Sequence, residues 1–390
     1  MGSEFIPYGR HDIQESDIDA VIHTLQSDFL TQGPAVPKFE QAVLDFCGAY
    51  HAVAVNSATS ALHVALMALR VGSNDIVWTS PNTFVASANA ALYCGAQVDF
   101  VDIDPDTYNM SVHALQKKLE HAERLGKLPK VVIPVHLAGQ PCEMQAINEL
   151  AQSFGFKVLE DASHAIGGCY RDGPIGNCVY SDITVFSFHP VKIVTTAEGG
   201  MAVSNDSDLA ERMRLFRSHG ITRDPSMMTH SPHGPWYYQQ VVLGYNYRMT
   251  DLQAALGISQ MQRLEEYIVR RRSIADRYSR ELSDLPLSLP KQIEFSYSAY
   301  HLYVVRLDLA AISPLSHAEV FQALWDRGIF VNLHYIPVHT QPYYENMGFA
   351  WGDFPNAEAY YQSAISIPMF PTLTCESQTK VISSLHEILA

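Results

Sequence analysis

The sequence predicts an α/β protein built on a largely parallel sheet with helices on both faces. Between about residue 50 and residue 205, short apolar segments alternate with stretches of helical periodicity, which is the pattern of βαβ units. The chain has 390 residues, of which 47% are hydrophobic and 17% charged, so it can bury a large core. The strands predicted for this sheet are 52–56, 76–79, 98–101, 131–135, 157–160, 183–187 and 200–204.

Two helices are predicted before the sheet begins. Ile18 and Leu25 belong to an apolar pattern of helical spacing, and Phe39 and Val43 indicate a second helix. Between the two helices, the segment 31–34 (Thr-Gln-Gly-Pro) is typical of a turn.

Small polar residues follow the first predicted strand, in the segment 56–60 (Asn-Ser-Ala-Thr-Ser), and a helix begins there. Free N–H groups and the positive end of a helix make such a turn an anion site, to which Thr59 and Ser60 can add hydroxyl groups. The same residue types also serve as ordinary helix N-caps, so that interpretation stays open.

The fifth predicted strand ends in a carboxylate, Asp161. Open α/β sheets contact their ligands at the carboxyl ends of strands, so Asp161 is a candidate site residue. The alternative is a helix cap. His164 follows within one helical turn, where it can orient Asp161, contact a ligand ring, or serve only as a structural histidine.

The sixth strand leads into the segment 187–192 (Ser-Phe-His-Pro-Val-Lys), and Glu198-Gly199-Gly200 then gives a tight turn. A lysine beyond a buried strand can be desolvated, which lowers its pKa towards the nucleophilic neutral form. We interpret Lys192 as a residue that forms a Schiff base with pyridoxal phosphate (PLP). Asp161 then keeps the pyridine nitrogen of PLP protonated, as its action as an electron sink requires. A solvated loop lysine is the alternative.

The C-terminal part is predicted as a second, smaller α/β domain. One long helix is expected from Thr250 to Leu282, and the arginines 270–272 on it are interpreted as a solvated face, with a diphosphate contact as the alternative. Strands near 301–307 and 329–333 follow. The predicted domains are residues 6–249 and 250–390.

Three ordered motifs resemble the DegT/StrS family of PLP-dependent sugar aminotransferases: Asn56 to His63, Glu160 to Ala165, and Phe186 to Lys192. The resemblance extends over nearly the whole chain. It implies the type I (aspartate aminotransferase) fold, with a large, mostly parallel seven-stranded sheet domain and a smaller C-terminal domain. Some members are dehydratases with histidine in place of the lysine, so Lys192 implies transamination.

The same resemblance implies roles for further residues. The residues implied to bind PLP are Ala58, Thr59, Ser60, Phe84, Asp161, His164, Ser187, Lys192 and Asn246. Phe84 is implied to stack on the pyridine ring, although core packing is its alternative role. Asn246 is implied to reach the phosphate bound by a neighbouring chain, which predicts a homodimer with shared active sites. The residues implied to contact substrate are Tyr8, Thr31, Gln32, Gly33, His334 and Tyr335.

Within the family, the segments 6–10, 189–192 and 334–339 are most similar to members that act in pseudaminic acid biosynthesis. This implies amination at C4 of UDP-2-acetamido-2,6-dideoxy-β-L-arabino-hexos-4-ulose, with L-glutamate as amino donor. The sequence departs from that pattern at Ile193-Val194 and Ala197, where Pro-Ile and Gly are expected. The alternatives are another nucleotide keto-sugar as substrate, or a non-catalytic regulatory protein on the same fold.

Composition excludes other classes of protein. The chain has 26 Lys and Arg against 41 Asp and Glu, a net charge of −15, which argues against a nucleic-acid binder. The six cysteines form no C-x-x-C pair and no secretory leader is evident, so we expect reduced thiols in a cytoplasmic protein. No apolar run approaches membrane-spanning length, and no H-E-x-x-H motif is present, so we expect neither a membrane span nor a metal.

Overall fold

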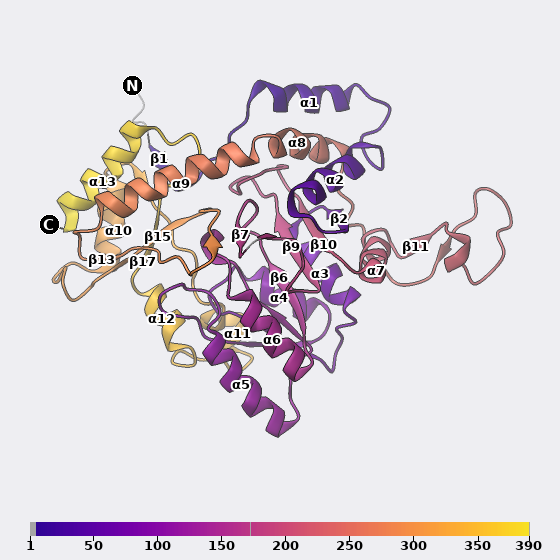
Figure 1. Cartoon of the computed structure of the whole chain (residues 1–390), viewed down its shortest axis with the longest axis horizontal. Coiled ribbons are helices and arrows are strands. Elements are labelled where there is room, and N and C mark those ends of the chain that lie inside the picture. Colours follow the sequence, from indigo (N-terminus) through magenta and orange to yellow (C-terminus); the bar gives the residue numbers. More distant parts are fainter. Residues whose placement is uncertain (1–4, 172, 390) are drawn as a thin grey trace.

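The computed structural model describes residues 5–171 and 173–389, and a seven-stranded sheet forms its centre (Figure 1). The strand order is β2-β10-β9-β6-β5-β3-β4, and β10 runs antiparallel to both of its neighbours while the other pairs are parallel. The strands are β2 (His51–Val55), β3 (Ile76–Thr79), β4 (Gln97–Phe100), β5 (Val131–Ile133), β6 (Lys157–Asp161), β9 (Ile183–Ser187) and β10 (Gly200–Ser204). Each lies within about two residues of its predicted range, and the α/β prediction is confirmed.

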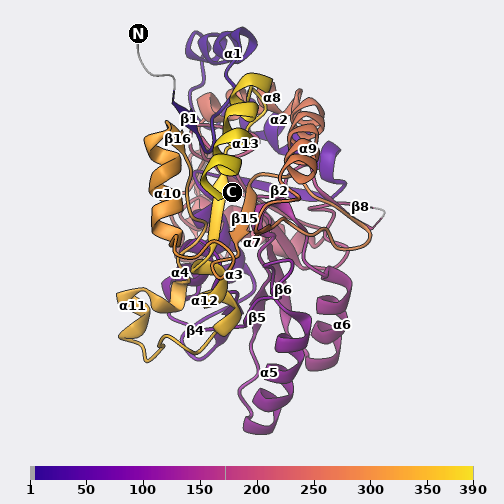
Figure 2. The ribbon, with the colours of Figure 1, turned by 90° about the vertical axis from the view of Figure 1, so that its left-hand side faces the viewer.

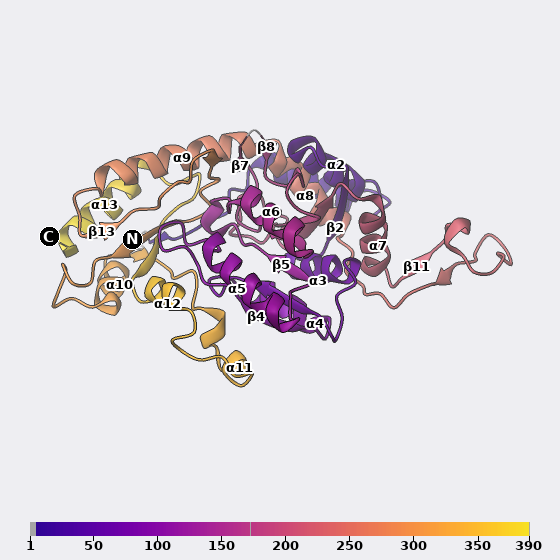
Figure 3. The ribbon, with the colours of Figure 1, turned by 60° about the horizontal axis from the view of Figure 1, so that its bottom comes forward.

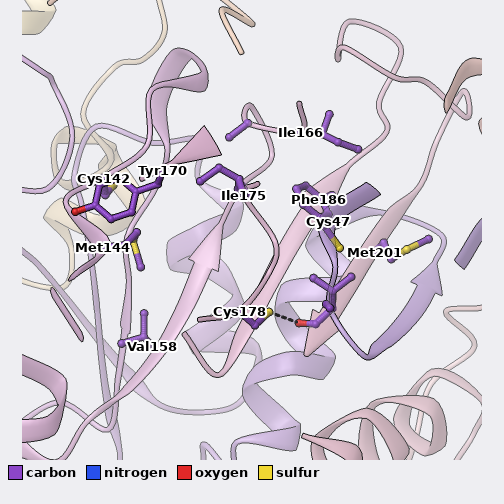
Figure 4. Packing of buried hydrophobic residues seen from close by; sticks show 14 of the residues in the cluster. Cys47, Cys142, Met144, Val158, Ile166, Tyr170, Ile175, Cys178, Phe186 and Met201 are labelled. Carbon is purple, nitrogen blue, oxygen red and sulfur yellow. Dashed lines mark hydrogen bonds between the residues drawn. The ribbon is translucent and has the colours of Figure 1, made fainter. Parts of the chain in front are cut away.

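Helices cover both faces of this sheet (Figure 2), and each face has its own apolar core. Alternation along the strands divides the side chains, so that Val185 enters one core and Phe186 the other. Helices α3 (Ala58–Ala68), α4 (Ala86–Tyr93) and α7 (Ser207–Arg217) cover the Val185 side; α2 (Ala35–Cys47), α5 (Val112–Leu125) and α6 (Met144–Phe154) cover the other. Figure 4 shows part of the second core, where Phe186 and Met201 of the sheet lie near Cys47 of α2.

The C-terminal part has a third apolar core, which also contains Ile6 from the other end of the chain. Strand β1 (Ile6–Pro7) pairs in parallel with β16 (Ile329–Phe330), so the N-terminal segment is joined to the C-terminal elements. The main elements here are α9 (Leu264–Glu281), α10 (His317–Asp326), α13 (Cys375–Leu389), β13 (Leu287–Ser288), β15 (Tyr303–Leu307) and β17 (Ala364–Ile367). The proposed domain boundary between residues 249 and 250 stays a prediction.

A hairpin formed by β11 (Ile221–Thr222) and β12 (Gln239–Gln240) projects from the body of the molecule (Figure 3). The remaining helices are α1 (Glu15–Leu25), α8 (Asp251–Met261), α11 (Pro342–Glu345), α12 (Pro355–Tyr361), η1 (Leu137–Gly139), η2 (Pro225–Met227) and η3 (Val338–Thr340). The remaining strands are β7 (Cys169–Tyr170), β8 (Gly173–Pro174), β11 (Ile221–Thr222), β12 (Gln239–Gln240) and β14 (Ser296–Tyr297).

The prediction of one long helix from Thr250 to Leu282 is wrong. Helix α8 ends at Met261 and α9 begins at Leu264, because Arg263 leaves helical geometry with φ −109° and ψ 7°. The guanidinium of Arg263 donates to the carboxylate of Asp17 in α1 at 2.7 Å. This tertiary contact accompanies the break, and apolar spacing cannot reveal it.

The interpretation of the arginines on α9 as a solvated face is wrong. Arg271 is 1% exposed, and its guanidinium donates to the backbone carbonyl oxygens of Tyr300, His301 and Met369 at 3.1–3.2 Å. Arg270 likewise donates to two backbone carbonyl oxygens of later loops. These carbonyl groups come from segments distant in sequence. The residue pattern of the helix alone therefore predicts the wrong surroundings for its arginines.

Replacing Arg271 with alanine is therefore expected to destabilise the fold strongly. The variant leaves three buried carbonyl oxygens without their hydrogen-bond donor and opens a cavity. We therefore expect the free energy of unfolding to fall by about 3 kcal/mol or more. Urea unfolding measures this loss. Arg280→Ala, at a 69% exposed side chain on the same helix, is the control and should cost less than about 1 kcal/mol. Equal losses in the two variants would contradict the structural role of Arg271.

Candidate functional site

A cavity of about 730 Å³ lies at the carboxyl ends of β6 and β9, beside the first turn of α3. Segments from both ends of the chain complete its wall. The sequence-predicted residues that line it are Tyr8, Ala58, Thr59, Ser60, Phe84, Asp161, His164, Ser187, Lys192, His334 and Tyr335. The structure therefore brings together most of the residues that the sequence selected from segments far apart in the chain.

Lys192 is the only lysine or arginine lining this cavity in the described part of the chain. It sits on the turn that follows β9, where the backbone N–H of Lys192 donates to the carbonyl oxygen of His189 at 2.9 Å. Burial lowers the pKa of Lys192 to about 8, and the negative charge of Asp161 partly offsets that effect. About a tenth of this amine is thus neutral and nucleophilic at about pH 7, far more than for an ordinary lysine.

Asp161 ends β6 and is 5% exposed. Its Oδ2 accepts a hydrogen bond from the Ser87 hydroxyl at 2.6 Å, and its Oδ1 accepts one from the backbone N–H of Ser163 at 3.1 Å. These two donors fix the orientation of the carboxylate. Asp161 lines the cavity and is not a helix cap, because no helix begins beside it in the described residues.

The neighbouring carboxylate, Glu160, is buried with different partners, because successive residues of a strand point to opposite faces. His136 lies with Nε2 at 2.7 Å from Glu160 Oε2, and the hydroxyls of Ser181 and Thr184 donate to Oε1. Burial alone would raise the pKa of Glu160, but these donors, His136 first, hold it below its usual value. Glu160 is therefore a structural anion outside the cavity lining.

The first turn of α3 supplies an anion site at the cavity wall. Ser57 is the N-cap: its hydroxyl oxygen accepts the N–H of Ser60 at 3.1 Å, while the Ser60 hydroxyl donates to Asn56 Oδ1 at 2.7 Å. The remaining N–H groups of the first turn have no partner within the helix. A Cβ on Gly200 would lie 2.5 Å from the backbone nitrogen of Ala58, so β10 can pack against this turn only with glycine there. Capping and anion binding thus use the same turn.

His164 and Phe84 line the cavity in different ways. His164 Nδ1 accepts the backbone N–H of Ala138 at 3.2 Å, so the ring proton lies on Nε2, which is 3.2 Å from the Tyr335 hydroxyl. Burial, with the nearby charge of Lys192, lowers the pKa of His164 well below its usual value and keeps the ring neutral. Phe84 is 57% exposed, so it is not a core residue.

The C-terminal segment contributes His334 and Tyr335. His334 Nδ1 lies 2.9 Å from the Ser366 hydroxyl, and burial lowers the pKa of His334 to about 3. The ring of Tyr8 lies 5.1 Å from the His334 ring. The site is therefore closed on this side by neutral aromatic groups.

Several lining residues were not predicted from the sequence. They are Asn56, Ser57, Leu62, Thr83, Ala86, Ser87, Val135, Ser163, His189, Val191, Glu198, His301, Asn332 and Leu333. His301 packs with its ring 4.4 Å from that of His164, and Ser87 bonds Asp161 directly. Both are polar side chains at buried positions, so each contributes a specific contact.

Four predicted residues lie outside the cavity of their own chain: Thr31, Gln32, Gly33 and Asn246. Thr31 forms a backbone bridge with Thr250, and the N–H of Gly33 donates to Asp251 at 2.8 Å. Asn246 is exposed. Their predicted roles in binding stay predictions.

Two further features concern residues 5–171 and 173–389. No group of three or more His, Cys, Asp or Glu side chains in this part could hold a metal ion. No helix formed by the same residues has the length and apolar character needed to cross a membrane.

The donor set of the cavity fits pyridoxal phosphate. The molecule has an aldehyde, a ring nitrogen, an aromatic face and a phosphate, and it acts as an electron sink when its ring nitrogen is protonated. The cavity offers the amine of Lys192, the buried carboxylate of Asp161, the exposed ring of Phe84 and the helix N-terminus at Ala58. Each group of the cofactor thus has a chemically matched residue.

Comparison with known proteins agrees with this fit. Residues 11–386 match the DegT/DnrJ/EryC1/StrS aminotransferase family. The chain is 40% identical to the spore coat polysaccharide biosynthesis protein SpsC of Bacillus subtilis, over 99% of this chain and 98% of that one. It is 37% identical to the uncharacterized protein MJ1066 of Methanocaldococcus jannaschii, over 99% and 98% of the two chains.

Solved structures show the same fold. Helicobacter pylori PseC, an aminotransferase of pseudaminic acid biosynthesis, superposes with a TM-score of 0.89 at 30% identity, over 99% of each chain. The PLP form of Spr1654 from Streptococcus pneumoniae, assigned as a sugar aminotransferase, gives a TM-score of 0.88 at 29% identity, over 99% of this chain and 100% of that one. The predicted fold and cofactor are confirmed. The chain therefore belongs to the DegT/DnrJ/EryC1/StrS family of PLP-dependent sugar aminotransferases.

Proposed function

We propose that this enzyme transfers the amino group of L-glutamate to C4 of a UDP-linked 4-keto-6-deoxy-N-acetylhexosamine. The proposed substrate is UDP-2-acetamido-2,6-dideoxy-β-L-arabino-hexos-4-ulose, an intermediate of pseudaminic acid biosynthesis. The observation that carries the proposal is the convergence of Lys192, Asp161 and the segment 332–335 on one cavity, in a chain that resembles PseC over its whole length. A different nucleotide keto-sugar is the second candidate, favoured by the likeness to SpsC.

Each residue has a defined task in this proposal. Lys192 would hold the cofactor covalently and, once released, move a proton between the α-carbon of the donor and C4′ of the cofactor. Asp161 would hold the proton on the ring nitrogen, and the first turn of α3, with Thr59 and Ser187, would bind the phosphate. Bound PLP supplies the electron sink that stabilises the developing carbanion. Phe84 would cover one face of the ring, and Tyr8, His334 and Tyr335 would contact the sugar.

The titration of Lys192 gives a test in the cofactor-free enzyme. An amine reacts with an acylating reagent only in its neutral form, so Lys192 should reach half of its maximal reactivity at about pH 8. An ordinary lysine reaches that point near about pH 10.4. Because Asp161 raises the pKa of Lys192, Asp161→Asn should move the midpoint further down. Mass spectrometry after competitive acetylation measures the midpoint of Lys192 in the wild type and in Asp161→Asn. A midpoint that matches that of the exposed lysines contradicts the role assigned to Lys192.

We also propose a homodimer in which Thr31, Gln32, Gly33 and Asn246 reach the cavity of the partner chain. Asn246 is exposed, while its neighbours are fixed to their own chain: the N–H of Asn56 donates to the Tyr247 carbonyl oxygen at 2.8 Å. This arrangement leaves Asn246 free to face another molecule.

The six cysteines are free thiols, which supports a reducing compartment such as the cytoplasm.

Mixing two inactive variants tests the shared site. Lys192→Ala and Asn246→Ala should each be impaired, yet unfolding and refolding them together should restore activity. One of the two sites in each hybrid then has both native residues, so about a quarter of the sites should recover. Self-contained sites would show no recovery, which would contradict the shared arrangement.

The substrate proposal is tested with PLP, L-glutamate and two UDP-linked ketones that differ at C5. Products are identified by mass and NMR. Amination of the L-arabino ketone alone supports the pseudaminic acid assignment, whereas preference for the D-xylo epimer places the enzyme in another 4-amino-sugar pathway. No amination of either ketone, together with no cofactor absorbance, would support a non-catalytic role.

A further inference from the structure

The Asp161 carboxylate is oriented by a buried hydroxyl group. Its Oδ2 lies 2.6 Å from the Ser87 Oγ, and its Oδ1 accepts the backbone N–H of Ser163 at 3.1 Å. Ser87 is 1% exposed, so water does not compete for this contact. The Ser87 hydroxyl is therefore an integral part of the surroundings of Asp161.

The direction of the hydrogen bonds follows from the acceptor. The Ser87 hydroxyl donates its one proton to Asp161 Oδ2, and its oxygen is then free to accept. The Thr83 Oγ1 lies 2.8 Å from the Ser87 Oγ and is therefore the donor to it. Thr83 is 2% exposed. Thr83, Ser87 and Asp161 thus form a directed chain of hydrogen bonds, in which each bond polarises and strengthens the next.

The same turn carries Phe84. Thr83 and Ser87 are four residues apart at the start of α4, and Phe84 lies between them with its ring in the cavity wall. The bond from Ser87 to Asp161 joins positions 74 residues apart in sequence. It therefore joins the turn that carries Phe84 to the strand end that carries Asp161.

We propose that Thr83 and Ser87 are positioning residues for the cofactor ring: their hydroxyl chain orients Asp161 and holds the turn of Phe84 over the ring. This inference rests on the role proposed above for Asp161. An aligned carboxylate retains the proton of the pyridine nitrogen, and loss of the Ser87 hydroxyl frees Asp161 to rotate out of that alignment.

The test is the protonation of the ring nitrogen, followed by ¹⁵N NMR in holoenzyme loaded with ring-labelled PLP. In the wild type the nitrogen should stay protonated from about pH 6 to about pH 9. Ser87→Ala should shift the midpoint of deprotonation by about one pH unit, because it changes both the alignment of Asp161 and the stabilisation of its charge. Thr83→Val, which keeps the side-chain shape, should shift it by a smaller amount, and Ser87→Thr should restore it.

Thr79→Val is the matched control. Thr79 is fully buried and donates to the carbonyl oxygen of Ile133 at 2.9 Å, but it does not line the cavity. It should leave the midpoint unchanged, and an equal shift there would overturn the inference. If Asp161→Asn shifts the midpoint while Ser87→Ala and Thr83→Val do not, the hydroxyl chain has no such role. If Asp161→Asn has no effect either, the role proposed for Asp161 fails. If Ser87→Ala does not fold, the midpoint in Thr83→Val decides whether the hydroxyl chain has this role.

Discussion

Lys192→Ala is expected to lower kcat by at least about 10⁴-fold, because it removes both the covalent attachment point and the group that moves the proton. The variant should still bind PLP, since the first turn of α3 and Asp161 are unchanged. Steady-state kinetics measures the first effect, and absorbance after gel filtration measures the second. Lys192→Arg should be equally inactive, because arginine keeps the charge but cannot release its proton.

The control for this experiment is Lys157→Ala. Lys157 is 57% exposed and pairs with Asp182 at 2.7 Å at the far end of β6. Its loss should change kcat by less than about twofold, because an exposed ion pair contributes little. Sustained transamination by Lys192→Ala would contradict the role proposed for Lys192.

Asp161→Asn is expected to lower kcat by about 10²–10³-fold, the loss typical of removing one preorganised electrostatic group. A neutral amide no longer stabilises a protonated pyridine nitrogen, so the cofactor becomes a weaker electron sink. The amide oxygen can still accept from Ser87 or Ser163, so the midpoint of thermal unfolding should change little. Kinetics and calorimetry on the same sample separate these effects.

Glu160→Gln is the matched comparison, since it changes the adjacent carboxylate on the opposite face of β6. We expect stability to fall while kcat per folded molecule is kept. The pKa of Glu160 is held below its usual value in the folded state, so its stabilisation is present above the usual glutamate pKa and disappears as the pH falls. Urea unfolding at several pH values should therefore show a weaker acid dependence in Glu160→Gln. Loss of kcat as large as that of Asp161→Asn would contradict the separate roles.

The sheet was predictable because each central strand is an apolar segment bounded by polar or small residues. A strand such as β9, buried at all five positions, has no other place to lie than inside a covered sheet. The positions of Asp161 and Lys192 followed, because the carboxyl ends of neighbouring strands meet at one edge. The sequence motifs then identified the cofactor that these two side chains can hold.

Other features depend on contacts between distant segments. The break between α8 and α9 accompanies the contact of Arg263 with Asp17, and the burial of Arg271 depends on carbonyl groups about thirty and a hundred residues later. The apolar periodicity of a helix does not reveal either of these partners. Ser87 could have been suspected, because it follows Thr83 by one helical turn just after a central strand, but its contact with Asp161 is a property of the folded chain.

The most direct test of the account is to reduce the native holoenzyme with borohydride and to locate the cofactor by peptide mass mapping. We expect one cofactor on the peptide that contains Lys192, and none on that peptide in Lys192→Ala. Attachment to a different lysine, or no covalent cofactor in a sample that absorbs as PLP, would contradict it.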